Sequence, residues 1–302
     1  MSETQSYTTI ENITSLMSGF TVEITPKGAE KIEDFRHHLA TGTKVYVTAL
    51  PDTDFADTVK TCVKLAEQGM QAIPHITARS IDSKGELESR IKRITEEAGV
   101  TQVLDIAGAD KIASGPFEDS ASMLETGFFD KYGIKSIGIA GHPEGSPDIA
   151  HPMLREYGRR KIDYAQVTDI QLYLVTQFVF QAEPIINWLE RIRSENNQLP
   201  LVIGIPGIAS LKSLIGHAKA CGIGPSMTVL TKQAKNIHKL LTLQEPNELI
   251  RQLADYSATH PQSNIAGLHI FPLGGLLPSA KWAYKVAEGQ IELTKHAFKT
   301  VY

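Results

Sequence analysis

Polar side chains stand at or just beyond the ends of short apolar runs in this 302-residue sequence. The residues in question are Glu23, Thr48, His75, Asp110, His142 and Gln177. Carboxyl, imidazole and amide groups can donate or accept protons and can hydrogen-bond a heterocyclic ring. If the runs are parallel strands, their carboxyl ends meet at one edge of the sheet, so we expect these residues to form an active site.

Glu23 lies inside the β-rich run Phe20–Thr25. A carboxyl group that is removed from water holds its proton more readily, which suits a general acid near neutral pH. The alternative is a strand-end glutamate paired with a lysine or an arginine. The residues alone leave both interpretations open.

His75, in Pro74-His75-Ile76-Thr77, and His142, in Gly141-His142-Pro143, suit a metal ligand, an acid–base group or a cofactor contact. A histidine that is hydrogen-bonded in the core is the common alternative. No second histidine lies two or four residues from either one, and no cluster of carboxylates surrounds them, which argues against a metal site.

Gln177 interrupts a largely apolar run, and its amide can pair with a ring that carries both donors and acceptors, such as a pterin. A buried structural amide would give the same pattern. The basic triplet Arg159-Arg160-Lys161 suits phosphate binding or a solvated surface. The pair Gly274-Gly275 is weak evidence for a phosphate-binding site. The sequence contains neither a G-x-G-x-x-G nor a P-loop motif.

These residues need a scaffold of strands, and eight β-rich runs alternate with segments of helical period. The predicted strands are Phe20–Thr25, Lys44–Leu50, Ala72–Thr77, Gln102–Gly108, Ser136–His142, Leu172–Phe180, Leu201–Gly207 and Ile265–Leu273. The helical segments between them include Phe55–Gln68, Leu87–Ala98, Ile185–Ser194 and Leu211–Cys221.

Apolar strands separated by helices indicate a parallel sheet covered on both faces, and eight of them in unbroken alternation favour closure into a barrel. We therefore predict an α/β fold, a single (βα)8 TIM barrel that occupies residues 1–302 as one catalytic domain. The interval 226–262 holds two more helical patterns, Gln233–Leu243 and Pro246–Ser257. We interpret it as a helical excursion between strands 7 and 8.

The amino-acid composition limits the kinds of partner that the protein can bind. A net charge of −4 gives no electrostatic footprint for nucleic acid or for an anionic membrane, and no apolar stretch reaches the roughly 20 residues of a membrane span. Cys62 and Cys221 lie far apart in helical patterns, which suggests structural thiols in a reducing compartment. We expect a soluble cytoplasmic protein, and the sequence leaves assembly into a homo-oligomer open.

Six segments are distinctive when they are taken in chain order. They are Val22–Pro26, Val45–Thr48, Pro74–Thr77, Gly138–Pro147, Leu154–Lys161 and Val175–Phe180. Together they resemble the methylenetetrahydrofolate reductase family from the first strand to about the seventh. The resemblance implies a flavoenzyme that acts on one-carbon units carried by tetrahydrofolate.

The resemblance also implies roles for individual residues. Glu23 would donate the proton, and Gln177, with Phe178 and Asp110 nearby, would bind the tetrahydrofolate derivative. The residues expected to contact FAD are Thr48, His75, Gly108, Ala109, His142, Arg160 and Lys161, the last two at its phosphates. Reduced FAD would pass a hydride to the methylene carbon of the substrate, and NAD(P)H would reduce the flavin.

This chain departs from the family pattern on its fourth, fifth and eighth strands. The family's fourth strand usually ends in Gly-Asp, whereas here Gly108 is followed by Ala109 and then Asp110, so the carboxylate is moved by one residue. In the fifth-strand motif, His142 stands where the family often has tyrosine, and Ser146 stands where it often has histidine. The eighth strand, His269–Gly274, keeps little more than the family's pattern. The departures on the fourth and eighth strands bear on reductant preference, reaction direction and flavin affinity.

Two rival functions remain at this stage. One is a flavin-free barrel that transfers a methyl group from folate to an acceptor. The other is a protein that binds folate or flavin without catalysis, which the Ala109 departure makes conceivable. The absorption spectrum of the purified protein separates the flavoenzyme from the methyltransferase, because only the former is yellow.

Overall fold

The computed structural model describes residues 9–51, 53–146, 149–221 and 240–302. Eight parallel strands form a closed barrel in the order β1-β10-β7-β6-β5-β4-β3-β2, which confirms the predicted (βα)8 fold. The strands are β1 Thr21–Ile24, β2 Lys44–Val47, β3 Gln71–Thr77, β4 Gln102–Ile106, β5 Ser136–Gly141, β6 Gln171–Thr176, β7 Leu201–Pro206 and β10 Ile265–Phe271.

The chain divides into two compact units, which we describe separately. The amino-terminal unit comprises residues 21–141 and 146–175. The carboxyl-terminal unit comprises the segment that ends at Phe20, residues 142–145 and residues 176–302. The expectation of one catalytic domain stays a prediction.

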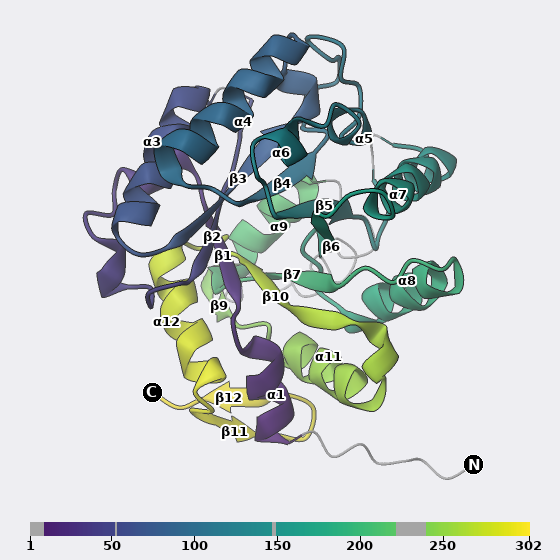
Figure 1. The fold of residues 1–302 in the computed structure, drawn as a ribbon. Coiled ribbons are helices and arrows are strands. Elements are labelled where there is room, and N and C mark those ends of the chain that lie inside the picture. The colour runs from purple at the N-terminus through teal and green to yellow at the C-terminus, as the bar shows by residue number, and fades with distance from the viewer. Residues whose placement is uncertain (1–8, 52, 147–148, 222–239) are drawn as a thin grey trace. The chain divides into compact units, whose positions relative to one another are not determined.

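In the amino-terminal unit, α3 (Phe55–Glu67) and α4 (Lys84–Ala98) lie side by side (Figure 1). Ser83 caps α4 by accepting a hydrogen bond from the Glu86 amide at 3.1 Å, and Gly99 ends the helix in the left-handed conformation. Four more helices belong to this unit: α2 Pro26–Ala29, α5 Ala121–Leu124, α6 Phe128–Lys131 and α7 His151–Ala165. Leu87, Ile91 and Ile94 form the buried face of α4.

In the carboxyl-terminal unit, α1 (Ile10–Met17) packs against α11 (Asn247–Thr259) and α12 (Leu276–Ala287), as Figure 1 shows. Trp282 is fully buried and donates to Asn247, which donates in turn to the Phe298 carbonyl group. The other elements outside the barrel are α8 Ala182–Ser194, α9 Leu211–Ala220, the 3-10 helix Pro261–Ser263 and the short strands β8 Ala209–Ser210, β9 Leu243–Gln244, β11 Ile291–Leu293 and β12 Phe298–Thr300.

The structure contains the predicted strands and helices, with small changes at their ends. The second strand stops at Val47 rather than Leu50, because Leu50 and Thr53 exchange hydrogen bonds in a turn. In the excursion, α11 confirms the second helical pattern. The first pattern, Gln233–Leu243, lies outside the described residues as far as residue 239. Its last residue, Leu243, belongs to strand β9 and not to a helix, so the prediction was wrong at its carboxyl end.

Strand pairing is the physical reason that the chain is not helical at Leu243. Leu243 lies opposite Ser210 in the antiparallel pair β8–β9, which draws the chain into an extended conformation there. Helix α1, helix α12 and the β11–β12 hairpin were not predicted. No helix among the described residues is both long enough and apolar enough to cross a membrane.

The fold requires glycine where another backbone segment lies too close to leave room for a Cβ atom. A Cβ atom on Gly204 of β7 would lie 2.4 Å from the Thr176 carbonyl oxygen, whereas one on Gly158 of α7 would meet nothing within 4 Å. Gly204→Ala should therefore lower the free energy of unfolding by about 1–3 kcal/mol. Gly158→Ala, the matched control, should raise it by about 0.4–1 kcal/mol. Urea unfolding measures both, and equal stability of the two variants would contradict the packing of β7.

Candidate active site

Glu23 lies on the inner face of the barrel. Its register partner on β2 is Tyr46, and residues opposite each other in register point to the same side of a sheet. On β3, β4 and β5 the same rule aligns His75, Leu104 and Gly138 with one another. Glu23 is half-buried, so its carboxyl group is partly withdrawn from solvent.

Two tyrosines that the sequence analysis missed meet next to Glu23. The hydroxyl groups of Tyr46 and Tyr173 lie 2.8 Å apart in a hydrogen bond. A Cβ atom on Gly138 would lie 3.0 Å from the Tyr173 hydroxyl group, so glycine makes room for this ring. Burial raises the pKa of Tyr173 to about 12 and, with the Tyr173 hydroxyl group and the Glu23 charge, raises the pKa of Tyr46 well above its usual value.

The signal for this pair was present in the sequence. Lys44-Val45-Tyr46-Val47 and Gln171-Leu172-Tyr173-Leu174 both place a tyrosine inside a run of apolar residues on a predicted strand. An aromatic ring with a polar tip is a common strand residue, so the pattern alone does not distinguish core packing from a role in a site.

The ends of β2, β3 and β4 border a pocket of about 130 Å³. His75, Thr77, Arg90, Ala109 and Asp110 are among the residues that line it. The His75 ring stands edge-on to the Tyr46 ring, with their centroids 6.2 Å apart. This pocket therefore adjoins the inner face that carries Glu23.

Thr48 and Gly108 hold the backbone at the two strand ends beside this pocket. The Thr48 amide donates to the Ile24 carbonyl oxygen at 3.0 Å, which extends the contact between β1 and β2 by one residue. Gly108 has a φ of +91°, a conformation that favours glycine, and a Cβ atom there would lie 3.2 Å from the Cβ atom of Thr77.

The Gly108 turn decides where the displaced carboxylate lies. Ala109 is exposed at the family's usual aspartate position, and Asp110 follows it, half-buried at the pocket wall. Arg79 Nη1 donates to the Asp110 carbonyl oxygen at 3.0 Å and fixes this turn. The carboxylate thus remains at the pocket, one residue further along the chain.

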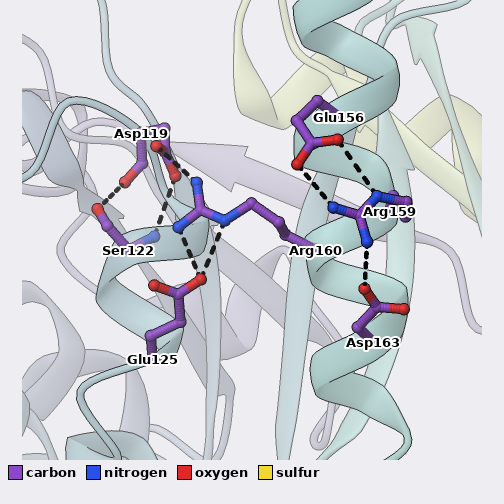
Figure 2. Close-up of polar contacts among 7 residues, drawn as sticks. All are labelled: Asp119, Ser122, Glu125, Glu156, Arg159, Arg160 and Asp163. Carbon is purple, nitrogen blue, oxygen red and sulfur yellow. Dashed lines mark hydrogen bonds and ion pairs between the residues drawn. The ribbon is translucent and has the colours of Figure 1, made fainter.

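Arg160 of α7 is already engaged by two carboxylates (Figure 2). Its Nη1 donates to Asp119 at 3.0 Å, while its Nε and Nη2 donate to Glu125 at 3.0 and 2.7 Å. Three of the five N–H groups of a guanidinium are therefore used. The neighbouring Arg159 pairs with Glu156 and Asp163 of its own helix.

Lys161 lies beneath the surface, within electrostatic range of Asp105 of β4. Lys161 is 7% exposed, and Asp105 is fully buried on the outer face of its strand, because it is one residue beyond Leu104. Burial raises the pKa of Asp105 to about 8, although the Lys161 charge opposes the rise. Burial also lowers the pKa of Lys161, against the attraction of Asp105. The Asp105 oxygens accept no hydrogen bond from the described residues.

The remaining predicted residues belong to the carboxyl-terminal unit. Gln177 directly follows β6, and its Oε1 accepts a hydrogen bond from the Phe178 amide at 3.0 Å. Phe178 is 2% exposed and packs edge-on against Phe180 and Phe271. His142 follows β5, and its carbonyl oxygen accepts from the Gly145 amide.

The structure thus brings part of the predicted set together. In the amino-terminal unit, His75, Ala109 and Asp110 share the pocket, and Glu23 shares the inner face with the Tyr46 ring that His75 contacts. Arg160 and Lys161 of the same unit lie in the α7 charge cluster, which we define as Asp105, Asp119, Glu125, Arg160 and Lys161. Whether Gln177, Phe178 and His142 complete one site with Glu23 stays a prediction.

A closed barrel of eight parallel strands, with polar side chains at the carboxyl ends of its strands, is the architecture of (βα)8-barrel enzymes. Within that class the chain belongs to the methylenetetrahydrofolate reductase family, whose sequence model matches residues 17–253. The match covers most of the chain and confirms the resemblance found in the strand-end segments.

Individual relatives match over shorter stretches. Methylenetetrahydrofolate reductase 2 of Saccharomyces cerevisiae is 28% identical over 93 residues, 30% of this chain and 15% of that protein. Methylenetetrahydrofolate reductase 1 of Schizosaccharomyces pombe is 25% identical over 160 residues, 49% of this chain and 25% of that protein. The matched stretches thus span a quarter or less of the length of these two relatives.

A solved structure gives an independent comparison of the fold. It is an uncharacterised protein from Clostridium thermocellum that binds two copies of 5-methyl-5,6,7,8-tetrahydrofolic acid. It aligns with a TM-score of 0.55 and 13% identity over 92% of this chain and 96% of that chain. At this identity the likeness establishes the shared fold.

A flavin nucleotide, the cofactor associated with the family, can be tested against these residues. The pocket beside His75, Ala109 and Asp110 has polar and apolar walls, but its volume of about 130 Å³ is below the roughly 300 Å³ at which ordinary ligand pockets begin. The basic pair fits a pyrophosphate less well. Arg160 has two carboxylates within hydrogen-bonding distance, and the Lys161 ammonium is buried beside Asp105.

The buried carboxyl group predicts a pH dependence of stability. Because the pKa of Asp105 is about 8 in the folded state and 3.8 in its reference state, the folded protein binds the extra proton between those values. The free energy of unfolding should therefore fall as pH rises from about 4 to 8. Asp105→Asn should flatten that slope, because an amide has no proton to lose over this range.

Urea unfolding at several pH values measures the slope. Asp57→Asn, at an exposed carboxylate paired with Lys60, is the matched control and should leave it unchanged. Identical slopes in the wild type and in Asp105→Asn would contradict the assignment of Asp105 as the titrating group.

Proposed function

We propose that this protein interconverts 5,10-methylenetetrahydrofolate and 5-methyltetrahydrofolate by hydride transfer through bound FAD, with NAD(P)H as the electron partner. The observation that carries the proposal is Glu23 on the inner face of β1, adjoining a pocket formed by the ends of β2 to β4, in a chain of this family. The ligand named for the Clostridium thermocellum protein supports a folate substrate.

Glu23 is the general acid in this proposal. Its carboxyl group would give a proton to the ring nitrogen of the folate whose bond to the bridging carbon breaks. A carboxyl group within reach of that nitrogen can serve as a general acid. Gln177 would hold the pterin through its amide, and Phe178 would support it from the buried side.

FAD, when bound, supplies the hydride for this chemistry. Thr48, His75, Gly108, Ala109 and His142 are the residues proposed to contact its ring, and Arg160 and Lys161 its phosphates. For the phosphates to reach Arg160, its contacts with Asp119 and Glu125 would have to open, or the phosphates would have to use its two remaining N–H groups.

One rival gains support from the same residues. A flavin-free barrel that transfers a methyl group from 5-methyltetrahydrofolate needs a folate site and an acid but no pyrophosphate site. The engagement of Arg160 by two carboxylates supports this alternative, because it leaves the guanidinium less available to a pyrophosphate. A cytoplasmic location, where the thiol of buried Cys62 stays reduced, belongs to either enzyme proposal.

The absorption spectrum of the protein, purified after expression in riboflavin-supplemented cells and again after incubation with FAD, tests the choice. A flavin spectrum that is bleached anaerobically by NADH or NADPH supports the reductase. A colourless protein that does not take up FAD, yet consumes 5-methyltetrahydrofolate when a thiol acceptor is present, supports the methyltransferase and overturns the reductase.

The role of Glu23 predicts a loss of turnover without a loss of fold. Glu23→Gln keeps the shape of the side chain but removes its proton, so folate reduction in a single turnover should slow by about 10²–10⁴-fold. Flavin absorption and the unfolding midpoint should stay close to those of the wild type. Glu30→Gln, at an exposed carboxylate just after α2, is the control. A rate within a few-fold of the wild type would rule out Glu23 as the acid.

The role of Gln177 predicts a defect confined to folate. Removing an amide that recognises a substrate leaves polar atoms of the ring without partners, at a cost of about 1–3 kcal/mol. Gln177→Ala should therefore weaken folate binding by about 5-fold to 150-fold, while flavin reduction by NAD(P)H stays nearly normal. Gln181→Ala, at the exposed residue before α8, is the control. Equal damage to both half-reactions would indicate a structural amide.

A further inference from the structure

The chain leaves the regular strand ladder at the end of β6, where Gln177 begins. In a regular parallel pair, one residue bonds two residues of the neighbouring strand that lie two positions apart. Gly204 of β7 instead donates its amide to the Thr176 hydroxyl group at 2.8 Å and accepts from the Val179 amide at 3.2 Å. These two partners lie three positions apart, so Gln177 and Phe178 form a bulge with one extra residue.

The Thr176 hydroxyl group holds this bulge by taking the place of a backbone acceptor. Thr176 is 1% exposed, so its bond with the Gly204 amide is shielded from water and would be costly to lose. A Cβ atom on Gly204 would lie 2.4 Å from the Thr176 carbonyl oxygen and 3.0 Å from the Gln177 carbonyl carbon, so the bulge lies directly against β7. A β-bulge changes the direction of the side chains that it carries, and this one carries Gln177.

The bulge also fixes the orientation of the Gln177 amide. The Phe178 amide is a donor and can bond only an acceptor, so the atom that it meets at 3.0 Å must be the Gln177 oxygen Oε1. Nε2 makes no hydrogen bond with any residue that the structure describes, and Gln177 is half-buried. The two N–H groups are therefore at the end of the amide that is turned away from the backbone and can meet a ligand.

We propose that Thr176 is a positioning residue for Gln177, and that Gln177 recognises its ligand as a hydrogen-bond donor. The inference rests on the proposed function for the identity of the ligand, which is the pterin ring of a folate. The carbonyl oxygen at position 4 is the exocyclic acceptor of a pterin, and an amide that presents N–H groups would bind that atom. The bond between Thr176 and Gly204 holds the bulge, and the bulge holds the amide in this orientation.

Exchanging donor and acceptor on both partners tests the polarity of this contact. The ligands are 5-methyltetrahydrofolate and its 4-amino-4-deoxy analogue, which carries an amino group in place of the carbonyl oxygen. In isothermal titration calorimetry, which needs no turnover, the wild type should bind the first ligand at least about 5-fold more tightly. Gln177→Glu replaces the N–H groups by an acceptor, so its preference should reverse. Gln181→Glu adds the same charge at the exposed residue before α8 and, as the control, should keep the wild-type preference.

Substitutions of Thr176 test its positioning role. Thr176→Val keeps the shape of the side chain but removes the hydroxyl group, so the preference should fall to within about twofold of equal affinity. Thr176→Ser keeps the hydroxyl group and should retain the wild-type preference. Thr61→Val is the matched control, because it removes a buried hydroxyl group of α3 that donates to the Asp57 carbonyl oxygen at 2.8 Å. It should leave the preference unchanged.

The outcomes separate this inference from the proposed function. A preference that reverses in Gln177→Glu and is lost in Thr176→Val supports the inference, and the absence of reductase activity beside it would overturn the proposed function alone. Reductase activity with a preference that Thr176→Val leaves intact overturns the positioning role. Equal affinity of the wild type for the two ligands overturns the donor role of Gln177. If Thr176→Val does not fold, Thr176→Cys, whose thiol is a weaker acceptor, should give an intermediate preference, and an unchanged one overturns the positioning role.

Discussion

Alternation along parallel strands is the constraint on which the rest of this structure depends. Because successive side chains point to opposite faces, one residue separates the inner face of the barrel from the space beneath the helices. Leu104 faces inward, in register with His75 and Gly138, and Asp105 therefore faces outward, where it lies buried near Lys161. A slip of one residue on β4 would exchange these two environments and place a second carboxyl group inside the barrel.

The charged residues on the outer side of the barrel differ in what surrounds them. Arg160 and Lys161 lie next to each other on α7, yet one is held by Asp119 and Glu125 near the surface and the other lies buried near Asp105. Buried ion pairs add little net stability, because desolvation offsets much of the attraction. A helix placed in another register would move the buried Lys161 ammonium away from the carboxyl groups of Asp105 and Asp119. The α7 charge cluster therefore links this helix to β4 and to the segment around α5.

The strands and the barrel could be predicted because their signal is local and repeated. All eight runs were found, and errors were confined to ends where a turn, such as the one between Leu50 and Thr53, competes with the ladder. Strand-end residues such as His75 and Asp110 could be located for the same reason. The Tyr46–Tyr173 bond and the Asp105–Lys161 pair could not, because each joins residues more than 50 positions apart whose types are ordinary in a strand or a helix.

The folate chemistry and the electron source are separable in this chain. Both reactions need a proton on a folate nitrogen: on N10 when its bond to the methylene bridge breaks, and on N5 when it leaves the methyl carbon that is attacked. An acid at Glu23 thus serves either reaction, and its setting on β1 does not choose between them. The choice lies at α7, where a pyrophosphate would have to compete with Asp119 and Glu125 for one guanidinium. Two carboxylates already balance that charge, so a phosphate that binds there must either displace them or use the two N–H groups that they leave.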